Sequence, residues 1–173
     1  MIRILRQIFR TGIVTEPAPK ELQGIHEIGT QLQDVIWKRF SRSLTIRQVD
    51  AGSCNGCELE IHALNNAIYN CEKYGIHFTA SPRFADLLLV TGPVTHNMEI
   101  ALRRTYAATP APKLVVAVGD CGCNGGIFGE SYASLGGVDK VIPVDLIIPG
   151  CPPTPTDLLL GLLKLMEKMG AGA

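Results

Sequence analysis

The residues of this sequence with the most distinctive chemistry are its cysteines. Cys54 and Cys57 form a Cys-x-x-Cys pair in VDAGSCNGCELE, Cys121 and Cys123 lie in GDCGCNGG, and Cys151 lies in PGCPPTP. A Cys-x-x-Cys pair is typical of a redox dithiol, of half a zinc site or of half an iron–sulfur site. The choice among these depends on the backbone elements that present the other cysteines.

From residue 43 onward, strand and helix patterns alternate along the chain. The sequence predicts strands at 43–50, 76–81, 85–92, 113–120 and 141–150, and helices at 58–74, 95–108 and 155–170. The apolar runs ADLLLVTG and KLVVAVGD are typical of strands buried on both faces of a parallel sheet. Alternating strands and helices indicate a sheet with helices on both sides. We therefore expect an α/β fold with a doubly wound parallel sheet.

Residues 1–42 have a different character and are predicted to form a helical and extended N-terminal extension. MIRILRQIFR places its three arginines on one helical face and its apolar side chains on another, which suits contact with a membrane surface or a partner groove. A helix that covers the chain's own core is the alternative. TGIVTEPAPKE predicts an extended linker because its prolines interrupt helix, and residues 22–40 follow as a second helix. The predicted division is thus 1–42 for the extension and 43–173 for the α/β domain.

The composition excludes several classes of protein. Hydrophobic residues make up 46% of the chain and the formal net charge is zero, which argues against disorder and against a general affinity for nucleic acid. Only 18% of the residues are charged, which suggests that partner subunits cover part of the surface. No segment has the roughly 18 apolar residues of a membrane-spanning helix, and the N-terminus lacks the features of a secretion signal. We therefore expect a cytosolic protein, in which cysteine clusters bind metal more often than they form disulfides.

Three predicted loops carry cysteines to one edge of the sheet. Cys54 and Cys57 follow the first predicted strand, Cys121 follows the fourth, and Cys151 follows the fifth. Loops at the carboxyl ends of parallel strands gather at one edge, where ligands bind. Glycines in these loops let backbone N–H groups approach an anionic group. The pattern favours an iron–sulfur site over zinc, since structural zinc sites draw on close paired motifs. A dithiol would leave the two downstream cysteines without a role.

The remaining cysteines are expected to lie outside the ligand set. Cys71 falls within a predicted helix and is expected to be a small core residue. Cys123 lies two residues after Cys121 and is an alternative to it as a ligand. Because Cys121 comes first after the strand, we prefer it.

Four separated motifs together resemble a known family. GSCNGCELE, SPRFADLLLVTGPVT, VVAVGDCGCNGGIF and IIPGCPPTP are similar to the small-subunit family shared by energy-converting, membrane-associated (group 4) [NiFe] hydrogenases and the 20 kDa subunit of respiratory complex I. The resemblance implies a flavodoxin-like fold and an oxidoreductase subunit with one proximal [4Fe–4S] cluster. By motif, the ligands it implies are Cys54, Cys57, Cys121 and Cys151.

The first motif distinguishes two branches of this family. The complex I subunit has adjacent cysteines there, whereas Asn55 and Gly56 separate the two cysteines in this chain. The sequence therefore resembles the formate-hydrogenlyase and CO-induced hydrogenases. This implies as partners a large subunit with the nickel–iron active site, a ferredoxin-like (polyferredoxin) subunit and integral membrane subunits, at the cytoplasmic face of the inner membrane. The alternatives are a complex I-like quinone-reducing oxidoreductase and a non-redox, zinc-stabilised binding module.

Acidic residues next to the first motif are candidates for proton transfer. Glu60, three residues after Cys57, matches an acidic position of the family and is predicted to join a proton route at the subunit interface. The alternative is a carboxylate that interacts with the start of a helix, an explanation that applies more strongly to Glu58. His62 is expected at an interface or in the core.

Overall fold

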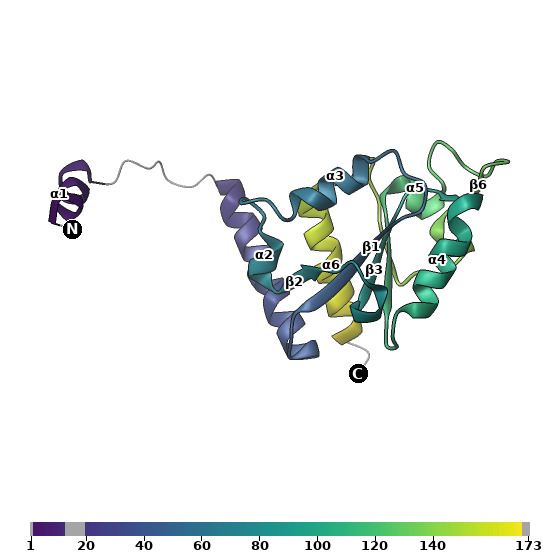
Figure 1. The fold of residues 1–173 in the computed structure, drawn as a ribbon, viewed down its shortest axis with the longest axis horizontal. Coiled ribbons are helices and arrows are strands. Elements are labelled where there is room, and N and C mark those ends of the chain that lie inside the picture. The colour runs from purple at the N-terminus through teal and green to yellow at the C-terminus, as the bar shows by residue number, and fades with distance from the viewer. Residues whose placement is uncertain (1, 13–19, 171–173) are drawn as a thin grey trace.

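The computed structural model describes residues 2–12 and 20–170. Its centre is a five-stranded, entirely parallel sheet in the order β2-β1-β3-β5-β7 (Figure 1). These strands are β1 (Leu44–Asp50), β2 (Ile76–Phe78), β3 (Leu87–Thr91), β5 (Leu114–Val118) and β7 (Leu146–Ile148). Counted along the chain, the order is that of the flavodoxin-like fold. The predicted fold class is therefore confirmed.

Helices cover both faces of the sheet. The first face carries α2 (Lys20–Phe40), α3 (Gly56–Ala63) and α6 (Pro155–Gly170), and the second carries α4 (His96–Ala108). In Figure 1, α2 and α6 lie side by side, and α4 lies on the other side of the sheet. Every residue of β3 and β5 is buried, because these strands lie inside the sheet and between both helical layers.

The two predicted N-terminal helices are present. The first, α1 (Ile2–Thr11), has no buried residue. The second, α2, packs along α6 and places Leu32 and Ile36 in the same core as the sheet. Of the linker predicted between them, residues 13–19 lie outside the described part of the chain.

The helix predicted at 58–74 is wrong in extent. Helix α3 begins at Gly56 and stops at Ala63, and a separate 3-10 helix, η1 (Cys71–Tyr74), follows later. The carboxamide oxygen of Asn66 accepts two backbone N–H groups, two and three residues further on, at 2.8 and 3.0 Å. Such local side-chain hydrogen bonds compete with the helical ladder.

Three further differences lie near the cysteine motifs. The glycine-rich loop expected after β5 is a short helix, α5 (Gly119–Asn124). The fifth strand is only three residues long, because it begins at Leu146 and ends directly before Pro149. A small antiparallel sheet of β4 (Val94–Thr95) and β6 (Ser134–Gly136) was not predicted. The remaining elements are the 3-10 helices η2 (Pro82–Phe84) and η3 (Val138–Lys140).

Helix α6 begins at Pro155, as predicted, and a pair of hydrogen bonds caps its start. The Thr154 hydroxyl accepts the N–H of Asp157 at 3.2 Å, and the Asp157 carboxylate accepts the N–H of Thr154 at 3.1 Å. This reciprocal capping box fixes the helix directly after the last cysteine motif. Among the described helices, none combines the length and apolarity needed to cross a membrane.

Candidate functional site

Four cysteines line one cavity at the carboxyl edge of the sheet. Cys54 and Cys57 follow β1, Cys121 lies in α5 directly after β5, and Cys151 follows β7. Together they border a cavity of about 140 Å³. The structure thus brings together the four residues that the sequence singled out, from three separate loops.

Glycines let the backbone approach two of these thiols closely. Gly119 has φ +79°, and a Cβ atom there would lie 2.5 Å from the Cys57 sulfur. Gly126 has φ +53°, and its Cβ would lie 2.8 Å from the Cys121 sulfur. Any larger residue would clash with a thiol and would adopt a left-handed backbone that L-residues disfavour. The backbone is therefore shaped closely around the sulfur atoms.

Asp120 connects two of the cysteine loops. Its backbone N–H donates to the Gly150 carbonyl at 2.9 Å, and its carboxylate accepts the Gly150 N–H at 2.8 Å. Each of these residues directly precedes a cavity cysteine, Cys121 or Cys151. Asp120 was not predicted as a site residue, although its place before a motif cysteine was the available signal.

The thiols affect one another electrostatically. Burial, followed by the charges of Glu58 and of the other three cavity cysteines, raises the pKa of Cys57 to about 12. Burial raises the pKa of Cys121 as well, and the nearby Cys151, Cys54 and Asp120 add to this. The thiolate forms of Cys57 and Cys121 are therefore disfavoured unless positive charge is bound beside them. A metal centre supplies such charge and holds cysteine in its deprotonated form.

Cys71 and Cys123 do not line this cavity. Cys123 is half buried, and its sulfur lies 3.9 Å from the Ile148 carbonyl oxygen as a donor. Cys71 is fully buried in the core, as predicted, and its thiol donates to the side-chain oxygen of Asn65 at 3.1 Å. The positions of both thiols agree with a ligand set made of the other four cysteines.

The two acidic residues of α3 differ in burial. Glu60 is partly exposed, and it does not border the thiol cavity. Glu58 is 8% exposed, and within the described part of the chain neither of its carboxylate oxygens has a hydrogen-bond partner. Glu60 is the acid predicted from the sequence for a proton route, whereas the buried acid beside Cys57 is Glu58. Exposed His62 lies on the same helix.

The thiol cavity adjoins an apolar patch on the surface. A neighbouring cavity of about 420 Å³ shares Cys54, Cys121 and Cys151 with it and reaches Ile127 and Phe128. Ile127 is 90% exposed and Phe128 is 52% exposed. Large apolar side chains that are exposed together are typical of a protein–protein interface.

The four cysteines border a cavity and do not surround the position of a single metal ion. Over residues 2–12 and 20–170, no three His, Cys, Asp or Glu side chains lie close enough together to hold one metal ion. Four thiols nevertheless border one cavity. This arrangement suits a group of several metal atoms, in which each thiolate binds a different atom.

Residues 54–165 match the family model described as NADH ubiquinone oxidoreductase, 20 Kd subunit. Formate hydrogenlyase subunit 7 of Escherichia coli (strain K12) is 47% identical over 76% of this chain and 52% of its own length, so the match spans about half of that relative. The probable membrane-bound hydrogenase subunit mbhJ of Pyrococcus furiosus is 43% identical over 76% of this chain and 79% of that protein. Both names are those of subunits of hydrogen-metabolising oxidoreductases.

A solved structure is also similar. A chain of the membrane-bound sulfane sulfur reductase, an archaeal respiratory membrane complex, superposes with a TM-score of 0.68 at 40% sequence identity. The match covers 81% of this chain and 77% of the chain in that complex. The structural similarity to this chain and the match to the family model therefore point to the same family.

Proposed function

Because the chain belongs to the family of the 20 kDa subunit of NADH:ubiquinone oxidoreductase, we propose that it is the electron-transfer small subunit of a membrane-associated [NiFe] hydrogenase. The observation that carries this proposal is the set of four cysteines, delivered by three loops to one cavity. The similarity to formate hydrogenlyase subunit 7 and to the membrane-bound hydrogenase subunit supports the hydrogenase branch.

We propose that Cys54, Cys57, Cys121 and Cys151 hold one [4Fe–4S] cluster. The cavity of about 140 Å³ supports this, since a water molecule takes about 30 Å³ in the liquid and the space therefore accommodates several atoms. A single zinc ion would need its sulfurs about 2.3 Å from one centre. When bound, a [4Fe–4S] cluster accepts and releases single electrons. This chain supplies the four thiolates and the backbone that approaches two of them closely.

The apolar patch of Ile127 and Phe128 is where we place the large subunit. Its position beside three of the cavity cysteines would keep the distance between the two metal centres short. The nickel–iron site and the bond-making chemistry with hydrogen belong to that partner. A ferredoxin-like subunit and integral membrane subunits complete the proposed assembly. We keep Glu60 as a candidate for a proton route at the interface.

Helix α1 is proposed to attach the α/β domain to the cytoplasmic side of the membrane or to a partner there. Its exposed apolar side chains are Ile2, Ile4, Leu5, Ile8 and Phe9. Arg3, Arg6 and Arg10 lie on the same helix and provide positive charge. Such a basic amphipathic helix suits an interface with anionic lipid headgroups.

A second candidate function is an electron-transfer subunit of a related complex that makes no hydrogen. The similarity to a chain of the sulfane sulfur reductase favours this candidate, as does the family's own description as a complex I subunit. The two candidates share the cluster and differ in the chemistry of the large subunit. A zinc-stabilised binding module is the alternative of another class.

The cluster is tested by anaerobic purification of the full chain without its partner subunits, so that no other iron centre contributes to the measurement. We expect about four irons for each chain, no zinc, and a low-temperature EPR signal after reduction. Cys151→Ser should remove this signal, and Cys123→Ser should leave it. One zinc for each chain and no iron would contradict electron transfer.

The hydrogenase branch is tested separately on the partner. The large subunit that copurifies should contain two Cys-x-x-Cys motifs for nickel, and the complex should evolve hydrogen from a reduced donor. A complex with the iron signal but without these motifs supports the second candidate.

A further inference from the structure

The sheet has a gap beside the second half of β1. Strand β2 pairs with β1 only from Leu44 to Ile46, because it ends at Phe78. On the opposite side, β3 pairs with β1 as far as Asp50. The last four residues of β1, Arg47–Asp50, therefore have a neighbouring strand on one side only.

Alternation along β1 determines which backbone groups face this gap. Thr45 and Ala51 form their backbone hydrogen bonds toward β3, whereas Leu44 and Ile46 form theirs toward β2. In a parallel ladder the N–H and C=O groups of one residue point to the same side, and successive residues alternate. The backbone groups of Gln48 and Asp50 therefore point toward the side where β2 has ended.

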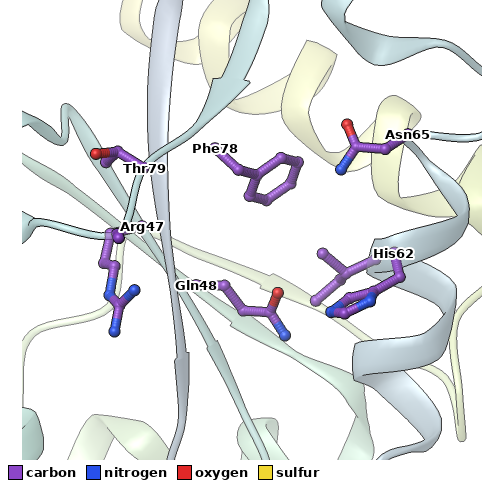
Figure 2. Close-up of a pocket in the computed structure, with 8 residues that line it drawn as sticks. Arg47, Gln48, His62, Asn65, Phe78 and Thr79 are labelled. Carbon is purple, nitrogen blue, oxygen red and sulfur yellow. The ribbon is translucent and has the colours of Figure 1, made fainter.

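A cavity of about 370 Å³ occupies this gap, which we call the notch. Besides β1, its walls are the end of β2 and helix α3; Figure 2 shows Gln48, Phe78, His62 and Asn65 on one side of β1 and Arg47 with Thr79 on the other. Cationic and amide side chains thus border a space that continues the line of β2.

Arg47 provides the charge of the notch. Its Nε atom is buried, and within the described residues it has no hydrogen-bond partner. By contrast, the guanidinium of Arg42 is paired with the Asp86 carboxylate through two hydrogen bonds, at 2.6 and 2.9 Å. A buried guanidinium N–H without an acceptor costs free energy, so an incoming carboxylate beside Arg47 would be favoured.

We propose that the notch binds an extended segment of a partner subunit, which adds a short strand to β1 and places an acidic side chain beside Arg47. This inference rests on the proposed function, since it needs a multi-subunit complex. Four residues of β1 span about 13 Å, so a segment of three or four residues fills the gap. Strand addition to a free sheet edge is an established mode of protein recognition.

Other occupants would leave either the backbone groups of Gln48 or the guanidinium of Arg47 without a partner. A helix uses its own backbone groups internally, so it cannot pair with Gln48. A small anion would pair with Arg47 and leave the Gln48 N–H and C=O without partners. An extended chain with an acidic residue provides partners for both the backbone groups of Gln48 and the charge of Arg47.

Hydrogen exchange of the purified complex, compared with the isolated full chain, tests this directly. The amides of Gln48 and Asp50 should exchange roughly tenfold or more slowly in the complex, since a tenfold change corresponds to about one additional hydrogen bond. The amides of Arg47 and Val49 point to β3. Their exchange rates should be nearly equal in the complex and in the isolated chain, so they serve as the internal control. Equal exchange of Gln48 in an intact complex overturns the proposal.

A photo-crosslinking residue at Ala80, which lines the notch, identifies the occupant. A cross-link to an extended, acidic segment of another subunit is expected. A cross-link to a helix, or to a second copy of this chain, overturns the proposal.

Charge reversal separates this proposal from the function on which it rests. Arg47→Glu should reduce retention of the partner severalfold and leave unchanged the iron content of this chain measured without its partners. Arg104→Glu, on the exposed face of α4, should change neither quantity. If the Arg47→Glu variant retains the partner fully, the proposed strand docking is contradicted and the proposed function is not. A chain without iron in every variant contradicts the proposed function.

Discussion

Asp120 and Gly150 exchange two hydrogen bonds between the loops that carry Cys121 and Cys151. One joins backbone to backbone at 2.9 Å, and the other joins the Gly150 N–H to the Asp120 carboxylate at 2.8 Å. Two segments thirty positions apart in the chain are thus held at one relative position. The spacing of two proposed ligands depends on this contact.

Replacing Asp120 should loosen the proposed cluster site. Asp120→Ala removes the acceptor of the Gly150 N–H, which costs about 1–3 kcal/mol when the donor stays buried. We expect less iron for each purified chain and faster cluster loss in the presence of a chelator. Asp120→Asn is the matched control, because its carboxamide oxygen still accepts this bond. Equal cluster loss in the alanine variant and the wild type would contradict this role.

Gly119 should not tolerate even an alanine. A Cβ there would lie 2.5 Å from the Cys57 sulfur, and φ is +79°. We expect Gly119→Ala to lose most of its iron, measured by metal analysis and EPR. Gly129→Ala controls for the backbone strain alone, since Gly129 has φ +53° and a Cβ atom there would meet no heavy atom within 4 Å. If both variants lose iron equally, strain and not the thiol contact is the cause.

The apolar patch beside the cysteines should hold the large subunit. Ile127→Asp introduces a charge at a side chain that is 90% exposed, so folding should be little affected. We expect copurification of the large subunit to fall by roughly fivefold or more, as for an interface residue worth over about 1 kcal/mol. Ile100→Asp, at a residue 61% exposed on α4, is the control. Unchanged copurification of the Ile127 variant would place the large subunit elsewhere.

Cys71 should make stability depend on pH above neutrality. Burial is the main cause that raises its pKa from 9.0 to about 11. Between these values the unfolded chain loses the thiol proton while the folded chain keeps it, so the stabilisation is complete below pH 9 and is lost as pH rises toward 11. The expected loss is about 2–3 kcal/mol.

Urea unfolding under anaerobic conditions, from pH 7 to pH 11, measures this effect. The free energy of unfolding of the wild type should fall toward that of Cys71→Ala as pH rises, because only the wild type has this thiol. A constant difference between the two proteins across the range would show that Cys71 does not contribute.

Several features could be predicted because their causes are local. The apolar runs of β3 and β5 determine buried strands, and Thr154 and Asp157 form their capping box within one helical turn. Alternation of strands and helices then implies a parallel sheet, whose carboxyl edge collects the loops. The fold class and the shared edge of the four cysteines therefore followed from the order of residues along the chain.

Other features depended on groups far apart in the chain. The tie between Asp120 and Gly150 and the close approach of Gly119 to Cys57 exist only once the loops pack together. The burial of Glu58, where Glu60 was favoured, follows from how α3 lies on the sheet. The notch beside Gln48 arises because β2 ends before β1 does. These features required the three-dimensional packing, since hydrophobic pattern and local capping specify elements but not the distances between them.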